Sequence, residues 1–251
     1  MIPKLVAHRG YMQSYPENSL LGLEMAMQAG ACMVEFDVQM SADQELIVLH
    51  DSDFRRTAGL TESVFDLTLS ELSLVSVHEA EKFGDRFIKT PVPTLRQFME
   101  LVSKYPAVTA FVELKDESLI QWGLEHVMDA VQKLLAPYTS QSVIISYNLR
   151  ALQYIKQRGL YPIGWVLTTF DEMHHKNALQ LKPQYLICNH KKIPDDGELW
   201  QGDWLWMLYD INDPELALQW GARGSELIET ADIGTMLQHA ELGRESCKRG
   251  V

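Results

Sequence analysis

The chain has 251 residues, of which 46% are hydrophobic and 22% charged, and its formal net charge is −12 at pH 7. This composition is ordinary for a folded globular chain, and a single (β/α)8 barrel typically uses roughly 250 residues. The acidic balance argues against nucleic acid as a partner, because a phosphate backbone selects basic surfaces. It does not exclude an anionic small molecule, because a bound cation can reverse the charge locally.

Cysteine usage and the absence of apolar segments bear on the cellular location. No stretch reaches the ~18 consecutive apolar residues of a membrane span, and no apolar signal-peptide core precedes His8. The three cysteines, Cys32, Cys188 and Cys247, are odd in number and widely spaced, without a CxxC motif. We interpret them as reduced, with Cys32 and Cys188 as small residues of apolar strands, and we expect a cytoplasmic protein.

Short β-type runs alternate with helical stretches along the chain, which is typical of a parallel α/β fold. We predict strands over residues 4–8, 32–38, 45–50, 109–114, 142–146, 161–167, 184–188, 204–209 and 225–228. We predict helices over residues 19–29, 94–104, 118–136, 148–158, 171–180, 213–220 and 232–242.

The predicted strands exceed the eight of a barrel by one, and the third is the extra one. Too few residues lie between Asp37 and Ile47 for a crossover helix, so we predict a hairpin across residues 41–44. Centred there, the hairpin pairs Glu35 with His50 and Asp37 with Val48. The other eight strands then close a (β/α)8 TIM barrel within one domain, 1–251. Residues 51–92 form a small insertion that we expect to lie over the barrel mouth.

Two of these strands carry acids where the interior of a barrel should be apolar. Side chains alternate along a strand, so Glu35 and Asp37 share one face, and Glu113 and Lys115 share another. An unpaired buried carboxylate costs several kcal/mol. Three of them on core-forming strands therefore indicate a bound cation and a metal-assisted active site. The alternative is that Glu35 and Asp37 face solvent on an edge strand.

Six short motifs together resemble the glycerophosphodiester phosphodiesterases, a family of phospholipase-C-like barrel phosphodiesterases. The motifs occur in family order and at family-like spacing, densely in the first half and more loosely as far as residues 212–215. They are His8-Arg9-Gly10, Pro16-Glu17-Asn18-Ser19, Glu35-Phe36-Asp37-Val38, His50-Asp51, Pro93-Thr94-Leu95 and Glu113-Leu114-Lys115.

The resemblance implies a role for each group of site residues. Glu35, Asp37 and Glu113 would hold one divalent cation, and their oxygen ligands favour Mg²⁺ or Ca²⁺ over zinc. His8 and His50 would be the general acid and base, with the assignment between them left open. Arg9 and Lys115 would bind the substrate phosphate.

The activity implied is hydrolysis of a glycerophosphodiester to sn-glycerol 3-phosphate and an alcohol such as choline, ethanolamine or glycerol. The alternatives are a phosphodiesterase of the same superfamily that acts on a lysophospholipid or phospholipid, and a non-catalytic barrel that binds metal or phosphate. The sequence leaves the oligomeric state open.

The C-terminal third departs from the family pattern. Tyr209-Asp210 stands where family members usually have Trp-Thr, and residues 229–232 replace the usual Thr-Asp-Arg-Pro. We expect Tyr209 to serve as an aromatic platform in the substrate pocket, and Tyr147 is a second candidate for its wall. These changes bear on substrate preference more than on reaction type.

Four further polar residues near the motifs have structural interpretations. Glu17 and Asn18 precede a predicted helix, and helix capping accounts for Asn18 in particular. Asp51 could orient His50 or fix the end of its strand. We interpret Arg56, beside Arg55, as part of an exposed basic pair.

Overall fold

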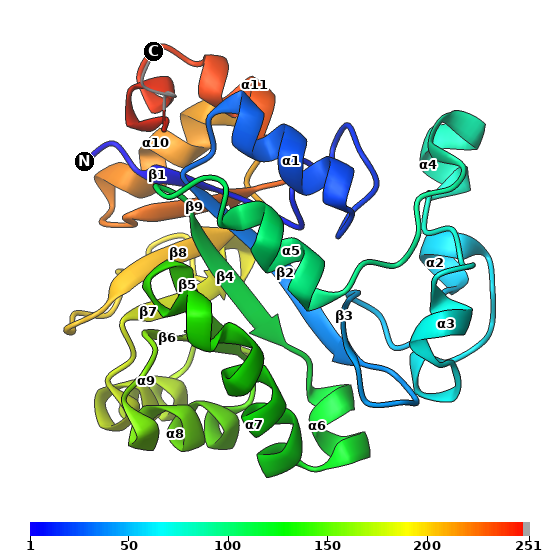
Figure 1. Cartoon of the computed structure of the whole chain (residues 1–251). Coiled ribbons are helices and arrows are strands. Elements are labelled where there is room, and N and C mark those ends of the chain that lie inside the picture. Colours follow the sequence, from blue (N-terminus) through cyan, green and yellow to red (C-terminus); the bar gives the residue numbers. More distant parts are fainter. Residues whose placement is uncertain (248–251) are drawn as a thin grey trace.

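The computed structural model describes residues 1–247 and shows a closed barrel of eight parallel strands with one added antiparallel strand (Figure 1). The strand order is β1-β9-β8-β7-β6-β5-β4-β2-β3, and pairing of β1 with β2 closes the barrel. The predicted (β/α)8 barrel is confirmed. The strands are β1 (Lys4–Ala7), β2 (Met33–Met40), β3 (Leu46–Val48), β4 (Thr109–Leu114), β5 (Ser142–Ser146), β6 (Ile163–Val166), β7 (Tyr185–Asn189), β8 (Leu205–Tyr209) and β9 (Leu227–Thr230).

Helices surround the barrel and bury its outer face. Most begin at a polar residue that accepts a backbone N–H, as Ser19 does for α1 and Thr94 does for α5. The helices are α1 (Leu20–Ala29), α2 (Arg55–Ala58), α3 (Leu69–Leu72), α4 (Ala80–Phe83), α5 (Leu95–Val102), α6 (Asp116–Trp122), α7 (Leu124–Leu135), α8 (Leu149–Arg158), α9 (Glu172–Leu181), α10 (Pro214–Ala222) and α11 (Ile233–Gln238). Short 3-10 turns are η1 (Val64–Asp66), η2 (Gly84–Phe87), η3 (Ala136–Gln141), η4 (His190–Lys192) and η5 (Leu242–Glu245).

The helix predicted over 118–136 is two helices. Gly123 separates α6 from α7 and adopts a φ of 86°, which a residue with a side chain rarely adopts. The chain bends there, so α6 follows directly from Lys115 at the end of β4.

The β2–β3 hairpin differs from the prediction by one residue. Val38 pairs with Val48, and Met40 pairs with Leu46. The side chain and backbone of Ser41 both bond to Glu45, which leaves a three-residue loop instead of the even-numbered one expected. The predicted pairs of Glu35 with His50 and of Asp37 with Val48 are therefore wrong. His50 lies beyond the end of β3, in the loop that follows.

Residues 51–92 lie beside the barrel, next to β3 (Figure 1). They have a small core of their own, which includes Phe54, Val64 and Leu72. Within this segment Glu79 accepts the backbone N–H of Glu17 at 2.6 Å. The insertion thus borders the mouth at the β1–α1 loop.

Cys32 and Cys247 form a disulfide, so the interpretation of all three cysteines as reduced is wrong for this pair. Cys188 is buried and free, as expected. The backbone N–H of Cys247 donates to the carbonyl of Gly30 at 2.9 Å, which places the end of the described chain beside the start of β2. The number and spacing of the cysteines therefore no longer support the prediction of a reducing compartment.

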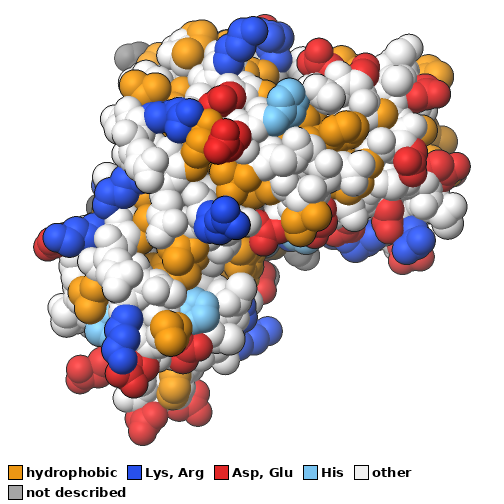
Figure 2. Space-filling model, turned by 90° about the horizontal axis from the view of Figure 1, so that it is seen from below, with side chains coloured by type: hydrophobic (Ala, Val, Ile, Leu, Met, Phe, Trp, Pro, Cys, Tyr) orange, Lys and Arg blue, Asp and Glu red, His pale blue; other side chains and the backbone are white. Residues whose placement is uncertain are grey.

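No helix of the described chain has the length and apolar composition that crossing a bilayer would require. In Figure 2 the Lys and Arg side chains of the described residues are scattered among acidic ones on this face and form no continuous basic surface.

Reduction of the disulfide is expected to destabilise the fold. The bond joins residues 215 apart, and loss of such a link typically costs about 2–5 kcal/mol of unfolding free energy. Denaturant unfolding with and without dithiothreitol measures the loss, and a Cys32→Ser/Cys247→Ser double variant should show no further change on reduction. Thiol counting on unreduced, unfolded protein should give one thiol; three would contradict the disulfide.

Candidate active site

The acids that the sequence singles out come together at the carboxyl ends of adjacent strands. Asp37 on β2 is the register partner of Glu113 on β4, and Glu35 stands two residues before Asp37 on the same face. All three are buried, at 2% exposed for Glu35, 1% for Asp37 and 8% for Glu113. They face the barrel interior, so the solvent-exposed alternative for Glu35 and Asp37 is excluded.

A fourth buried carboxylate, Glu229, belongs to the same site and was not among the predicted site residues. Leu227 of β9 packs in the apolar interior of the barrel, and Glu229 follows it on the same face, 4% exposed. The predicted strand stopped at residue 228, one short of this glutamate. Extending it to Thr230 would have shown the alternation that places Glu229 inside.

The two predicted cationic residues lie against these acids. Lys115 Nζ is 2.7 Å from Asp37 Oδ1 and 2.5 Å from Glu113 Oε1. Arg9 Nε is 3.2 Å from the other oxygen of Asp37, and the Arg9 backbone N–H donates to Glu35 at 3.1 Å. Arg9 has a φ of 50°, a left-handed turn that directs both groups toward the acids.

His8 lies directly after β1 on the same side of the barrel. Its Nε2 is 3.9 Å from Glu35 Oε2, and its Nδ1 is 4.0 Å from Asp210 Oδ1. Burial, together with the positive charge of Arg9, lowers the pKa of His8 to about 3. The imidazole is therefore neutral at pH 7 in the metal-free protein.

His50 reaches the cavity from the loop after β3, and a chain of charged groups holds it. Its Nδ1 is 2.6 Å from Asp51 Oδ1, and Asp51 Oδ2 is 2.9 Å from Arg56 Nε. The hydrogen bond to His50 lowers the pKa of Asp51 to about 2. Asp51 thus orients His50, which was one of its two predicted roles.

Arg56, Glu17 and Asn18 are more than surface or capping residues. Arg56 binds the buried Glu17 carboxylate through two nitrogens, at 2.6 and 2.7 Å. Asn18 Nδ2 donates to Asp37 at 2.8 Å, and its Oδ1 accepts the Asp37 backbone N–H at 3.3 Å. Ser19 caps α1 instead of Asn18. The predicted basic pair is exposed, as expected, but the sequence did not show that Arg56 also binds a buried carboxylate. The capping role of Asn18 is wrong, because its side chain contacts Asp37 on a distant strand.

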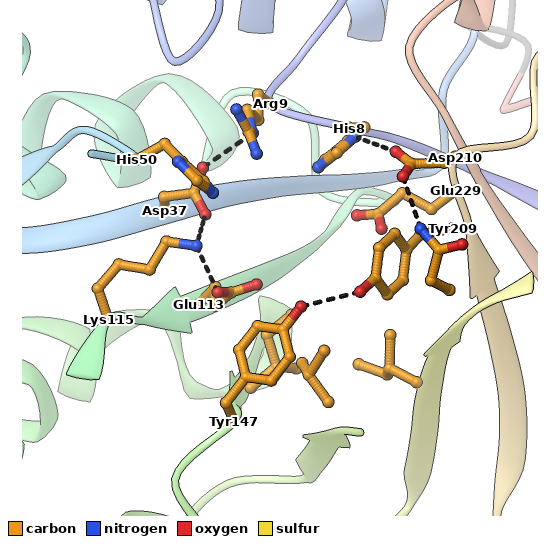
Figure 3. A pocket seen from close by; sticks show the side chains of 14 residues that line it. His8, Arg9, Asp37, His50, Glu113, Lys115, Tyr147, Tyr209, Asp210 and Glu229 are labelled. Carbon is orange, nitrogen blue, oxygen red and sulfur yellow. Dashed lines mark hydrogen bonds and ion pairs between the residues drawn. The ribbon is translucent and has the colours of Figure 1, made fainter. Parts of the chain in front are cut away.

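The two predicted pocket tyrosines meet on the opposite wall. Their hydroxyls are 2.9 Å apart and close one side of a cavity of about 300 Å³ (Figure 3). The residues that line this cavity are His8, Arg9, Asp37, His50, Glu113, Lys115, Ile145, Tyr147, Val166, Ile187, Asn189, Tyr209, Asp210 and Glu229. Acidic, basic and imidazole groups thus face two aromatic rings and a few aliphatic side chains.

The charge pattern of the site fits a divalent cation. Ligand oxygens of Glu35, Asp37 and Glu113 lie within 4.8 Å of one another, and Glu35 Oε1 is buried without a hydrogen-bond partner. Burial and the neighbouring Asp37 raise the pKa of Glu35 well above its usual range. Asp37 is also buried, but Lys115 and Arg9 hold its pKa well below its usual range. Like charges held this close and this deeply buried repel one another, and a bound cation would offset that repulsion.

Comparison with known proteins identifies the family. Residues 8–196 match the model of the glycerophosphoryl diester phosphodiesterase family, and the chain belongs to this family. The resemblance drawn from the six motifs is thereby confirmed.

Particular relatives agree with this assignment. A glycerophosphodiester phosphodiesterase of Caldanaerobacter subterraneus is 30% identical over 155 residues, which are 61% of this chain and 61% of that protein. One of Bacillus altitudinis is 33% identical over 154 residues, 58% of this chain and 62% of the relative. These matches thus span about three-fifths of each relative. An Oleispira antarctica phosphodiesterase, solved with its product sn-glycerol-3-phosphate, shares the fold, with a TM-score of 0.82 at 24% identity over 94% of this chain and 96% of that one.

Arg56→Ala is expected to destabilise the protein by about 1–3 kcal/mol, because it removes a charged partner from buried Glu17. The matched control is Arg55→Ala, since Arg55 is exposed and pairs only at the surface with Asp53. Arg55→Ala should change the free energy of unfolding by no more than about 0.5 kcal/mol. Denaturant unfolding measures both, and equal effects of the two variants would show that the Arg56–Glu17 contact contributes nothing.

Glu229→Gln is expected to stabilise the metal-free protein at alkaline pH. Burial and the charge of Glu113 raise the pKa of Glu229 well above that of an unfolded glutamate, about 4.3. The folded state therefore holds a proton that the unfolded state has lost, and stability falls as pH rises above about 4.3, by at most about 1.4 kcal/mol per pH unit.

Thermal unfolding in EDTA at pH 5 and pH 8 tests this sign. The variant should unfold at a higher temperature than the wild type at pH 8, and this difference in melting temperature should shrink toward pH 5. A constant difference across this range, or a gain confined to acid pH, would show that Glu229 is ionised throughout.

Proposed function

We propose that this chain hydrolyses glycerophosphodiesters to sn-glycerol 3-phosphate and an alcohol, in a reaction that requires one divalent cation, Mg²⁺ or Ca²⁺. The observation that carries the proposal is a cluster of three carboxylates at a cavity that two cationic side chains and two histidines also line. The product bound by the Oleispira relative supports a small phosphate ester as ligand. A barrel that only binds phosphate has no need of two histidines.

Glu35, Asp37 and Glu113 would hold the cation, because their oxygens form a compact all-oxygen set of the kind that Mg²⁺ and Ca²⁺ prefer. When bound, such an ion supplies positive charge that polarises a phosphoryl oxygen. Asn18 and the backbone N–H of Arg9 fix two of these carboxylates by hydrogen bonds. The orientation of the acids thus depends on the β1–α1 loop as well as on the strands.

Arg9 and Lys115 would bind the phosphate of the substrate. Both lie at the edge of the cluster formed by Glu35, Asp37 and Glu113, and both line the cavity. The guanidinium of Arg9 offers several donors in one plane, and the ammonium of Lys115 offers a concentrated charge. A phosphodiester carries one negative charge, so it is attracted to this edge and repelled from the acids behind it.

His8 and His50 would carry the protons. His8 lines the cavity close to Glu35, where its ring can take the proton from the attacking hydroxyl or water. Asp51 holds Nδ1 of His50, which leaves Nε2 of the ring to give a proton to the leaving alkoxide. The attacking oxygen bonds to phosphorus, the bond from phosphorus to the departing oxygen breaks as that proton arrives, and the free alcohol leaves. Where a hydroxyl of the substrate is the attacking group, the product of this step is a cyclic phosphate, and water then opens it to sn-glycerol 3-phosphate. Tyr147 and Tyr209 would face the organic part of the substrate.

The direct test is hydrolysis of glycerophosphocholine, glycerophosphoethanolamine and glycerophosphoglycerol, with detection of sn-glycerol 3-phosphate. Turnover should vanish in EDTA and return with Mg²⁺ or Ca²⁺. Absence of turnover on all three, with cation still bound, would refute the proposed substrate class. Release of phosphate ester from a lysophospholipid in the same assay would then favour the lipid alternative.

His50→Ala and Glu113→Gln should separate chemistry from cation binding. His50→Ala should lower kcat by roughly 10²–10⁴ while the affinity for Mg²⁺ stays close to wild type, since an acid–base group is lost and no ligand is. Glu113→Gln should weaken Mg²⁺ binding as well as turnover, because a ligand is lost. Calorimetric titration and initial rates check both. Equal loss of cation affinity in the two variants would contradict the assignment of Glu113 to cation binding and of His50 to proton transfer.

The cytoplasmic location predicted from the sequence stays a prediction. The Cys32–Cys247 disulfide argues against it, because disulfides persist mainly in oxidising compartments.

A further inference from the structure

Glu229 stands apart from the other acids of the site, because nothing in the proposed function uses it. It is buried on β9, and its Oε1 has no hydrogen-bond partner. The nearest cationic side chains, Arg9 and Lys115, are engaged with other carboxylates. A buried carboxylate oxygen without a donor is costly, so its presence inside the cavity points to a ligand.

The groups that surround Glu229 form a second set of cation ligands. Ligand atoms of His8, Glu35 and Glu229 all lie within 4.8 Å of one another, and this set shares only Glu35 with the set that includes Asp37 and Glu113. Glu35 also has one buried oxygen without a partner, Oε1, so each carboxylate of the second set has an oxygen free of hydrogen bonds. In Figure 3, Glu229 lies on the side of the cavity where His8 and Asp210 meet, away from Lys115.

We propose that His8, Glu35 and Glu229 bind a second divalent cation, of the kind that accepts imidazole nitrogen, such as Zn²⁺. Zinc accepts histidine nitrogen together with carboxylate oxygen, whereas the all-oxygen set nearby suits Mg²⁺ or Ca²⁺. His8 is 15% exposed and lines the cavity, so its ring nitrogen can be reached by an ion from there.

The second cation would inhibit the enzyme. In the proposed function, which this consequence rests on, His8 takes a proton from the attacking group. A nitrogen that holds a cation cannot take that proton, so the enzyme with one cation turns over and the enzyme with two does not. The charge of the site allows both states. Four carboxylates, two cationic side chains and one dication sum to zero, and a second dication raises the sum to +2.

The binding test uses the metal-free full-length chain, titrated calorimetrically with Zn²⁺ and followed by zinc analysis after gel filtration. Wild type should bind one more equivalent of zinc than Glu229→Gln or His8→Ala. Glu226→Gln is the matched control, because Glu226 directly precedes β9, does not line the cavity, and accepts the backbone N–H of Trp206. It should bind as much zinc as wild type.

Two binding results would overturn the proposal: the same zinc content in wild type and Glu229→Gln, or loss of an equivalent in Glu229→Gln but not in His8→Ala. The second would show that Glu229 acts through its charge and not with His8 as a ligand. Circular dichroism of each variant confirms that a lost equivalent does not reflect unfolding.

The activity test is made at saturating Mg²⁺ with increasing Zn²⁺, each variant compared with its own zinc-free rate. Half-inhibition of Glu229→Gln should require roughly tenfold more Zn²⁺ or higher than wild type, and Glu226→Gln should behave as wild type. Equal zinc sensitivity would overturn the inhibitory role. Absence of any turnover without zinc would refute the proposed function alone, since the zinc count does not depend on substrate.

Discussion

Mutual repulsion between buried carboxylates is the constraint on which this structure depends. Four acids on β2, β4 and β9 lie buried inside the barrel, and among the described residues Arg9 and Lys115 are the cationic side chains paired with Asp37. A barrel built for stability alone would place apolar residues there, as it does one layer below with Phe111 and Leu227. A bound cation would offset the cost of this arrangement, and folding and cation binding would then be coupled at this site.

Loops from both sides of the barrel mouth hold the acids and histidines in place. Glu17, from the β1–α1 loop, binds Arg56 of the insertion, and Arg56 in turn holds the Asp51 that orients His50. Asn18 from the same loop fixes Asp37. The insertion, residues 51–92, therefore contributes to the site through ion pairs with the β1–α1 loop. None of the described residues that line the cavity belongs to the insertion.

Local patterns in the sequence predicted most of the barrel. They could not predict contacts between segments that are distant along the chain. All nine strands and the acids on β2 and β4 follow from apolar runs and from alternation along a strand. The hairpin register depends on how Ser41 closes its loop, which the sequence does not display. Glu229 was not predicted, because the strand predicted over 225–228 ended one residue before it. The Cys32–Cys247 bond and the Asn18–Asp37 contact link positions that only the folded chain brings together.

The most direct test of a site built for a cation is an anomalous difference map from crystals grown with Mn²⁺. We expect a peak in contact with the carboxylates of Glu35, Asp37 and Glu113, with Lys115 Nζ withdrawn from Asp37. A map without a peak there, with Lys115 still bound to both Asp37 and Glu113, would contradict the role assigned to the three carboxylates.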